Sequence, residues 1–150
     1  MDNKANKELL SGIYKLAKTG IEATKAVLPK TEGEELKHEL NEQLCDYTDA
    51  AAWAEKEIIK DGSLPKDLNM FEKAMMWGSI QLHTLTEVSP EHIAEIMING
   101  TTMGIVDLSK HLGTCKDADE HIYKYAEDFI KKEEHHIENL KVFLKTFSPA

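Results

Sequence analysis

Arginine is absent from this 150-residue chain, and its 18 basic residues are all lysines. The planar guanidinium group, which binds phosphates and carboxylates through two parallel hydrogen bonds, is therefore missing. Asp and Glu number 27, and the resulting formal net charge of -9 repels nucleic-acid phosphates. These two features exclude arginine-finger mechanisms and argue against nucleic acid as a partner.

Cysteine and long apolar runs are also scarce. Only Cys45 and Cys115 are present, without CxxC spacing, and we expect two separate free thiols rather than a disulfide or a metal clip. No apolar run approaches the roughly 20 residues needed to span a bilayer, and the first residues lack the hydrophobic core of a signal peptide. The sequence therefore predicts a cytoplasmic protein without membrane contact.

The composition predicts a single helical domain over residues 1–150. With 41% hydrophobic residues the chain can bury one substantial core, and it lacks the change in composition expected between two domains. Apolar residues recur every three or four positions, and no segment alternates with a period of two. We expect an all-α fold, an up-and-down or ferritin-like four-helix bundle with one additional helix, with helices near residues 5–29, 32–61, 67–88, 90–112 and 118–147.

Capping residues indicate where two of these helices start. Ser89 precedes Pro90, which is the arrangement of an N-cap followed by proline in the first turn. Thr31 and Glu34 have the spacing of a capping box. Both positions coincide with the start of a helical apolar period.

The helix expected at 67–88 is apolar on more than one side. Besides a stripe that includes Phe71 and Met75, it carries Met76, Trp77 and Ile80 on its other faces. Such a helix is buried on several sides, either at the centre of the fold or in a contact between copies. We favour a homo-oligomer formed through helix 67–88, with binding of another protein as a further use of this surface.

A carboxylate stands at the centre of the apolar stripe of the last helix. Glu133 falls between Phe129 and Ile137, with His136 on the same face. Because burying an unpaired charge costs several kcal/mol, Glu133 has to be paired, protonated, bound to a metal or facing a wet cavity. The Glu-x-x-His spacing also places a carboxylate beside an imidazole, as in the carboxylate-bridged metal sites of helical bundles.

Two other helices offer partners for this pair. On helix 90–112, Asp107 and His111 are four residues apart near the apolar stripe, and they either ligate a metal or bond to each other. On helix 32–61, Glu35 and His38 repeat the Glu-x-x-His spacing but lie opposite the apolar stripe, so we expect them to face solvent. The polar residues of that helix on the core side or at its margin are Gln43, Tyr47, Glu39 and Asp46.

The helical layout and the segment from Glu133 to Ile137 resemble the ferritin-like superfamily, in particular rubrerythrin-type bundles. In that family a Glu-x-x-His on the last helix helps to hold two iron or manganese ions, and the resemblance implies this role for Glu133 and His136. It also implies a long crossover that sets helix 90–112 parallel to helix 32–61. Asp107 stands where the family would place a glutamate.

Two functions remain open at this point. The first is a non-catalytic ferritin-like bundle that acts through self-association or protein binding, with Glu133 and His136 as a structural polar pair. The second is a ferritin-like protein that binds iron, manganese or zinc through Glu133, His136, Asp107 and His111. The chain contains no GxSxG, P-loop, GxGxxG or HExxH motif, and whether it is an enzyme stays undecided.

Overall fold

The computed structural model describes residues 3–66, 73 and 89–144. Within these ranges it contains four α-helices and no strand, which confirms the predicted all-α class. The helices are α1 (Lys4–Val27), α2 (Glu34–Lys60), α4 (Pro90–Thr114) and α5 (Glu120–Leu144), and a short 3-10 helix, η1 (Leu28–Lys30), joins α1 to α2. The helix predicted over residues 67–88 lies outside the described residues, and so do residues 145–147 of the last predicted helix.

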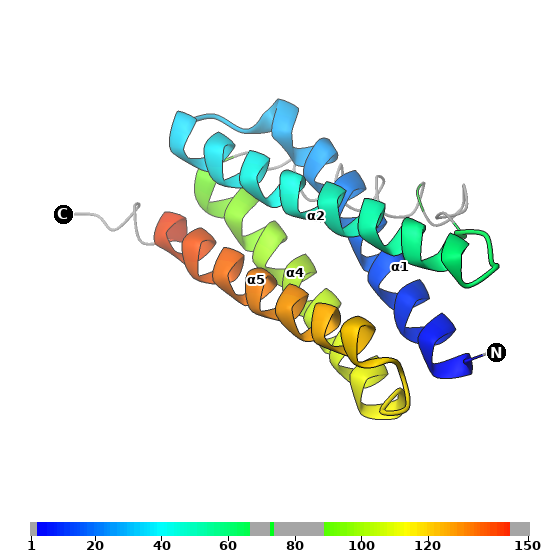
Figure 1. Ribbon diagram of the computed structural model, residues 1–150. Coiled ribbons are helices and arrows are strands. Elements are labelled where there is room, and N and C mark those ends of the chain that lie inside the picture. The colour runs from blue at the N-terminus through cyan, green and yellow to red at the C-terminus, as the bar shows by residue number, and fades with distance from the viewer. Residues whose placement is uncertain (1–2, 67–72, 74–88, 145–150) are drawn as a thin grey trace.

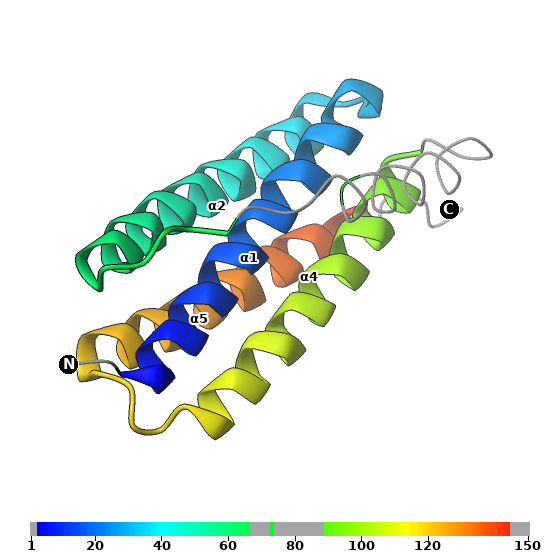
Figure 2. The same cartoon turned by 90° about the vertical axis from the view of Figure 1, so that its right-hand side faces the viewer.

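The four helices pack as a bundle in which α1 lies between α2 and α4 (Figure 2). The side chain of Asn3 donates to the carbonyl of Asp117 at 3.2 Å. The backbone N–H of Asp119 donates to Asn6 Oδ1 at 2.6 Å. These bonds place the start of α1 beside the end of α4, so the two helices run antiparallel.

The second antiparallel pair across the bundle is α2 with α5. His121 Nε2 lies 3.2 Å from Glu57 Oε2 at one end, and Asn139 Nδ2 donates to Glu39 Oε2 at 3.2 Å toward the other. The short connection through η1 also makes α1 antiparallel to α2. Consequently α2 runs parallel to α4, and the end of α2 and the start of α4 lie at opposite ends of the bundle (Figure 1).

Local hydrogen bonds explain the helix starts and correct one prediction. Ser89 caps α4 as expected, because its side chain accepts the N–H of His92 at 3.2 Å. The predicted capping box at Thr31 is wrong: the Thr31 hydroxyl donates to the carbonyl of Val27 at 2.8 Å and thus completes the end of α1. Helix α2 begins only at Glu34. The preceding Gly33 has a backbone angle φ of 93°, in the left-handed region that glycine adopts without steric cost.

The core consists of two apolar clusters that follow one another along the bundle. One is built from the first half of α1, the second half of α2, the end of α4 and the start of α5. The other takes the end of α1, the start of α2, the start of α4 and Leu140 of α5. Between them lie four buried polar side chains, which we call the polar layer: Gln43, Thr101, Glu133 and His136.

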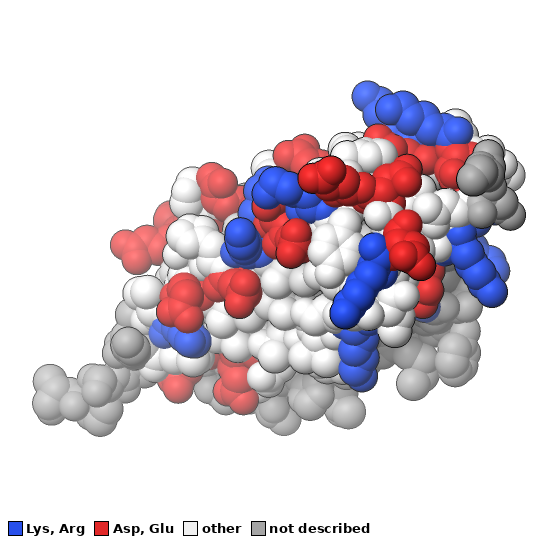
Figure 3. All heavy atoms as spheres, turned by 60° about the horizontal axis from the view of Figure 1, so that its bottom comes forward, with Lys and Arg blue, Asp and Glu red and all other residues white. Residues whose placement is uncertain are grey.

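Charged side chains cover much of the outside. On the face shown in Figure 3, Asp and Glu side chains gather along the upper part with lysines among them, and a broad uncharged area crosses the middle. Among the helices that the structure describes, none is both long and apolar enough to cross a membrane.

Candidate functional site

Glu133 is held in the polar layer by a neighbouring tyrosine. Its side chain is 1% exposed, and Oε2 accepts the hydroxyl of Tyr47 at 2.7 Å. Gln43 Nε2 donates to the oxygen of Tyr47 at 3.1 Å and to Thr101 Oγ1 at 3.0 Å. These bonds join α2, α4 and α5 in the middle of the bundle. Glu133 Oε1 and Gln43 Oε1 are buried without a hydrogen-bond partner among the described residues.

The environment of Glu133 favours its neutral form. Burial raises the pKa of this carboxyl to about 7, and the negative charge of Asp46 acts in the same direction. The bond from Tyr47 and the positive charge of His136 oppose the rise without cancelling it. The pKa of the Tyr47 phenol is itself well above its ordinary value, because of burial and the adjacent Glu133. At neutral pH Glu133 is therefore divided between its protonated and ionised forms.

His136 is held between two carboxylates of α2. Its Nδ1 lies 2.8 Å from Glu39 Oε1, and its Nε2 lies 2.6 Å from Asp46 Oδ2. Burial lowers the pKa of the imidazole, but the hydrogen bonds and charges of Glu39 and Asp46 outweigh that effect and leave the pKa above its ordinary value. This ion triad therefore favours an imidazolium that donates from both nitrogens.

The structure bears out the predicted side-chain directions around this pair. Glu133 and His136 are buried, and Glu35 and His38 are exposed. However, both ring nitrogens of His136 are already hydrogen-bonded, and Glu133 bonds to Tyr47. A metal ion bound by Glu133 and His136 would have to displace these bonds, and such a site stays a prediction.

The other two predicted ligands, Asp107 and His111, lie in different surroundings. Asp107 is exposed, although its sequence position had placed it near the apolar stripe of α4. His111 is partly buried and turns toward α1, where its Nδ1 lies 3.5 Å from Glu8 Oε1. The partner of His111 is therefore Glu8, from the first helix.

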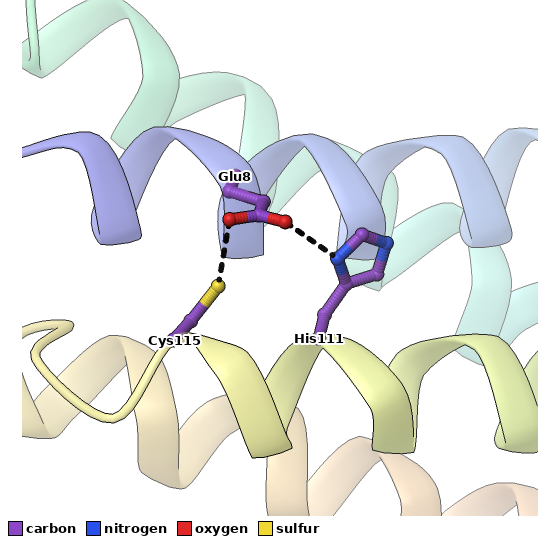
Figure 4. A group of neighbouring side chains, drawn as sticks. All are labelled: Glu8, His111 and Cys115. Carbon is purple, nitrogen blue, oxygen red and sulfur yellow. Dashed lines mark hydrogen bonds and ion pairs between the residues drawn. The ribbon is translucent and has the colours of Figure 1, made fainter.

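A third side chain completes a compact group at this point. Cys115 Sγ donates to Glu8 Oε2 at 3.3 Å, so that Glu8 bridges His111 and Cys115 (Figure 4). One ligand atom from each of the three residues lies within 4.8 Å of the other two. Within the described part of the chain, this is the one group of three or more His, Cys, Asp or Glu residues at such spacing. We call it the Glu8 cluster.

Backbone geometry holds the Glu8 cluster in place. The N–H of Cys115 donates to the carbonyl of His111 at 2.8 Å, as the C-cap of α4, so both side chains emerge from one face of the helix end. The imidazole of His111 rests against Gly12, where a Cβ atom would come within 2.9 Å of its Cδ2. Gly12 therefore allows the ring to lie against α1, one turn beyond Glu8.

The Cys115 thiol is shielded and stays protonated in this arrangement. The residue is fully buried, and burial together with the bond to Glu8 and its charge raises the thiol pKa above its ordinary value, despite an opposing contact with Thr114. Glu8 and His111 reach the surface, with side chains 50% and 36% exposed. The cluster thus combines a buried sulfur with two polar side chains open to solvent.

Sequence reasoning missed the Glu8 cluster. Its one local signal is the spacing of four residues between His111 and Cys115, which places two side chains on one helix face. The predicted helix ended at residue 112, which left Cys115 in a turn, whereas α4 continues to Thr114. Glu8 lies more than 100 residues earlier, and nothing in the spacing links it to α4.

Comparison of the chain with protein-family models, with curated proteins and with solved structures gave no match. The function is therefore inferred from the residues and their geometry.

Proposed function

We propose that this protein binds a transition-metal ion, with zinc as the best fit, through Glu8, His111 and Cys115. The observation that carries the proposal is the convergence of a carboxylate, an imidazole and a thiol from two helices onto one point. A thiolate and an imidazole select zinc and similar metals over magnesium and calcium, which prefer oxygen ligands.

Two separations in the cluster match those around a bound zinc ion. A tetrahedral zinc ion with bonds of about 2.0 to 2.3 Å separates its ligand atoms by about 3.3 to 3.8 Å. In the structure the thiol and the imidazole lie 3.3 Å and 3.5 Å from the two oxygens of Glu8. The ion would replace the thiol proton that Cys115 now donates to Glu8.

Three protein ligands leave the fourth position of a tetrahedral ion to water. The exposure of Glu8 and His111 makes that position accessible from outside. Binding also requires a thiolate and a neutral imidazole, so it releases protons and strengthens as the pH rises.

Titration with cobalt(II) tests the proposal directly, since the absorption of this ion reports thiolate ligation and tetrahedral geometry. We expect one equivalent of cobalt to give a thiolate-to-metal band, which zinc abolishes by displacement. Cys115→Ser should remove the band, and His111→Ala and Glu8→Gln should weaken binding by at least about tenfold, or about 1.4 kcal/mol each. Cys45→Ser, at the exposed second cysteine, is the matched control and should leave the titration unchanged.

A second pair of variants separates this site from the polar layer. In the Glu133→Gln and His136→Gln variants the cobalt band should persist with unchanged stoichiometry. Metal that survives loss of Cys115 but disappears with Glu133 and His136 would instead place the site in the middle of the bundle. The proposal also fails if the wild-type protein binds no metal at either group of residues.

Three sequence predictions remain proposals beside this one. The ferritin-like resemblance is supported by the parallel course of α2 and α4 and by a polar layer halfway along the bundle. Self-association through helix 67–88 concerns residues outside the described part of the chain, and sedimentation equilibrium of the whole protein tests it. Location in the cytoplasm likewise stays a prediction.

A further inference from the structure

A cavity of about 600 Å³ opens between α1 and α4, and no role has been assigned to it. Its walls are mainly apolar, with Leu16 of α1 and Ile96, Met97 and Leu108 of α4 among them. A space of this size and character is typical of a binding site for a small organic molecule. It adjoins the Glu8 cluster, since His111 forms part of its wall.

The exposure of the lining residues distinguishes a mouth from a floor. Lys15, Asp107 and Lys110 are exposed and therefore lie at the mouth. Tyr47 and Glu133 are buried and form a polar floor. A molecule that fills the cavity would place its outer end near these charges and its inner end against Glu133.

The floor is short of hydrogen-bond donors. In its ionised form Glu133 Oε1 is an acceptor, and it has no donor among the described residues. A buried acceptor without a partner costs about 1 to 3 kcal/mol, and more if it carries a charge. A ligand with several N–H groups would remove this cost at Glu133, which lines the cavity, while a ligand that only accepts would add to it.

Near its mouth the cavity is open down to the backbone of α4, because Gly100 is exposed. Gly100 lines the cavity, and a Cβ atom built there would meet nothing within 4 Å. Gly104, one turn later, is instead packed against Leu16, where a Cβ atom would come within 2.9 Å of Cδ1. The space beside Gly100 is thus available to a ligand, and a larger residue at that position would fill it.

From the apolar walls and the donor-poor floor we propose that this cavity binds a small organic cation, a primary amine with an apolar body, whose ammonium group lies against Glu133. The ammonium supplies three donors and a charge opposite to that of the carboxylate. The apolar body contacts Leu16, Met97 and Leu108. An anionic amphiphile with its head group near Lys15 and Lys110 is the competing ligand, and it would bring an apolar tail against the unpaired Glu133 oxygen.

Three molecules of equal length separate these ligands: n-octylamine, 1-octanol and octanoate, each titrated into the whole protein and followed by calorimetry and by amide chemical shifts. We expect saturable binding of octylamine at one site, at least about tenfold tighter than either of the others, because a charge-assisted hydrogen bond contributes about 1.5 to 3 kcal/mol. Equal or tighter binding of octanol or octanoate, or no saturable binding of octylamine, would overturn the proposal.

Two variants test the position of the ligand independently. Glu133→Gln keeps the shape of the floor and should weaken the binding of octylamine by at least about tenfold, with little effect on the binding of octanol. Gly100→Leu narrows the mouth and should weaken binding by at least about tenfold, whereas Gly113→Ala, on the same helix and outside the cavity, is the matched control. Octylamine affinity unchanged in both Glu133→Gln and Gly100→Leu would refute this location.

The cavity and the metal site can be tested apart. Glu8→Gln removes a proposed metal ligand that does not line the cavity, so octylamine binding should be unchanged in that variant and in the presence of a chelator. Loss of amine binding on removal of Glu8 would mean that the amine binds through the metal site and not against Glu133.

Discussion

The hydroxyl of Tyr47 donates to Glu133 Oε2 at 2.7 Å, and this bond joins α2 to α5 at the centre of the bundle. Tyr47 can occupy this position because Gly20 of α1 leaves room for its ring. The same tyrosine packs edge-on against Phe129, with ring centroids 6.2 Å apart. One side chain therefore connects the apolar core to the polar layer.

Glu133 makes the stability of the fold depend on pH. Its pKa rises from 4.5 in the unfolded chain to about 7 in the folded protein, so the folded state favours the neutral carboxyl. Its contribution to stability is fully present below about pH 4.5 and is lost as the pH rises through about 7. We expect the unfolding free energy of Glu133→Gln to rise relative to that of the wild type across this interval, by about 3 kcal/mol in total. Above the interval the difference should stay constant.

Urea unfolding of both proteins between pH 4 and pH 9 measures this effect. Glu134→Gln, at the exposed neighbouring residue, is the control and should show no such change. A difference between Glu133→Gln and the wild type that is the same at every pH would mean that folding does not change the pKa of Glu133.

The contribution of His136 to stability also falls as the pH rises, although the stabilised form is here the charged one. Because its folded pKa lies above the ordinary value of 6.5, its stabilising effect is full below about pH 6.5 and disappears as the pH rises through the folded pKa. We expect His136→Gln to lose about 1 to 3 kcal/mol of unfolding free energy under acidic conditions, since Glu39 and Asp46 lose their cation. His135→Gln, one position away and exposed, should be nearly neutral.

Gly20→Ala should destabilise the protein although alanine favours a helix. A Cβ atom at this position would come within 2.5 Å of the Tyr47 ring, which is held on its other side by hydrogen bonds. Overpacking of this kind costs about 1 to 3 kcal/mol, more than the gain of about 1 kcal/mol from helix propensity. Gly113→Ala meets no neighbouring atom and should not lower the unfolding midpoint in urea.

The two thiols should differ strongly in reactivity. Cys45 is exposed, whereas Cys115 is buried and its pKa is raised, so it has little thiolate near neutral pH. A thiol reagent such as dithionitrobenzoate should react with one group quickly and with the second slowly, and Cys45→Ser should remove only the fast phase. Two equally fast phases in the folded protein would contradict the burial of Cys115.

Helical periodicity predicted the core well because burial follows it directly. The centre of the apolar stripe of α5 correctly located Glu133, and the margin of the stripe of α2 correctly located Glu39 and Asp46. The phase of a helix therefore identified buried Glu133 and the partly buried pair that holds His136.

Contacts between helices could not be derived in this way. That His136 bonds to two residues of α2, and that His111 turns to Glu8, depends on how the helices are rotated against one another and on their exact ends. Asp107 shows the error involved, because a small rotation of α4 separates an exposed position from the apolar stripe. Thr31 shows that a capping residue can serve the preceding helix instead of the following one.

The polar layer also restricts how the helices can slide along one another. If α5 shifted by one turn against α2, Tyr47 would no longer face Glu133, and the carboxylates that flank His136 would lose it. Apolar contacts alone discriminate less sharply between registers, since hydrophobic burial has no preferred direction. The layer that weakens the bundle at high pH therefore selects a single register for it.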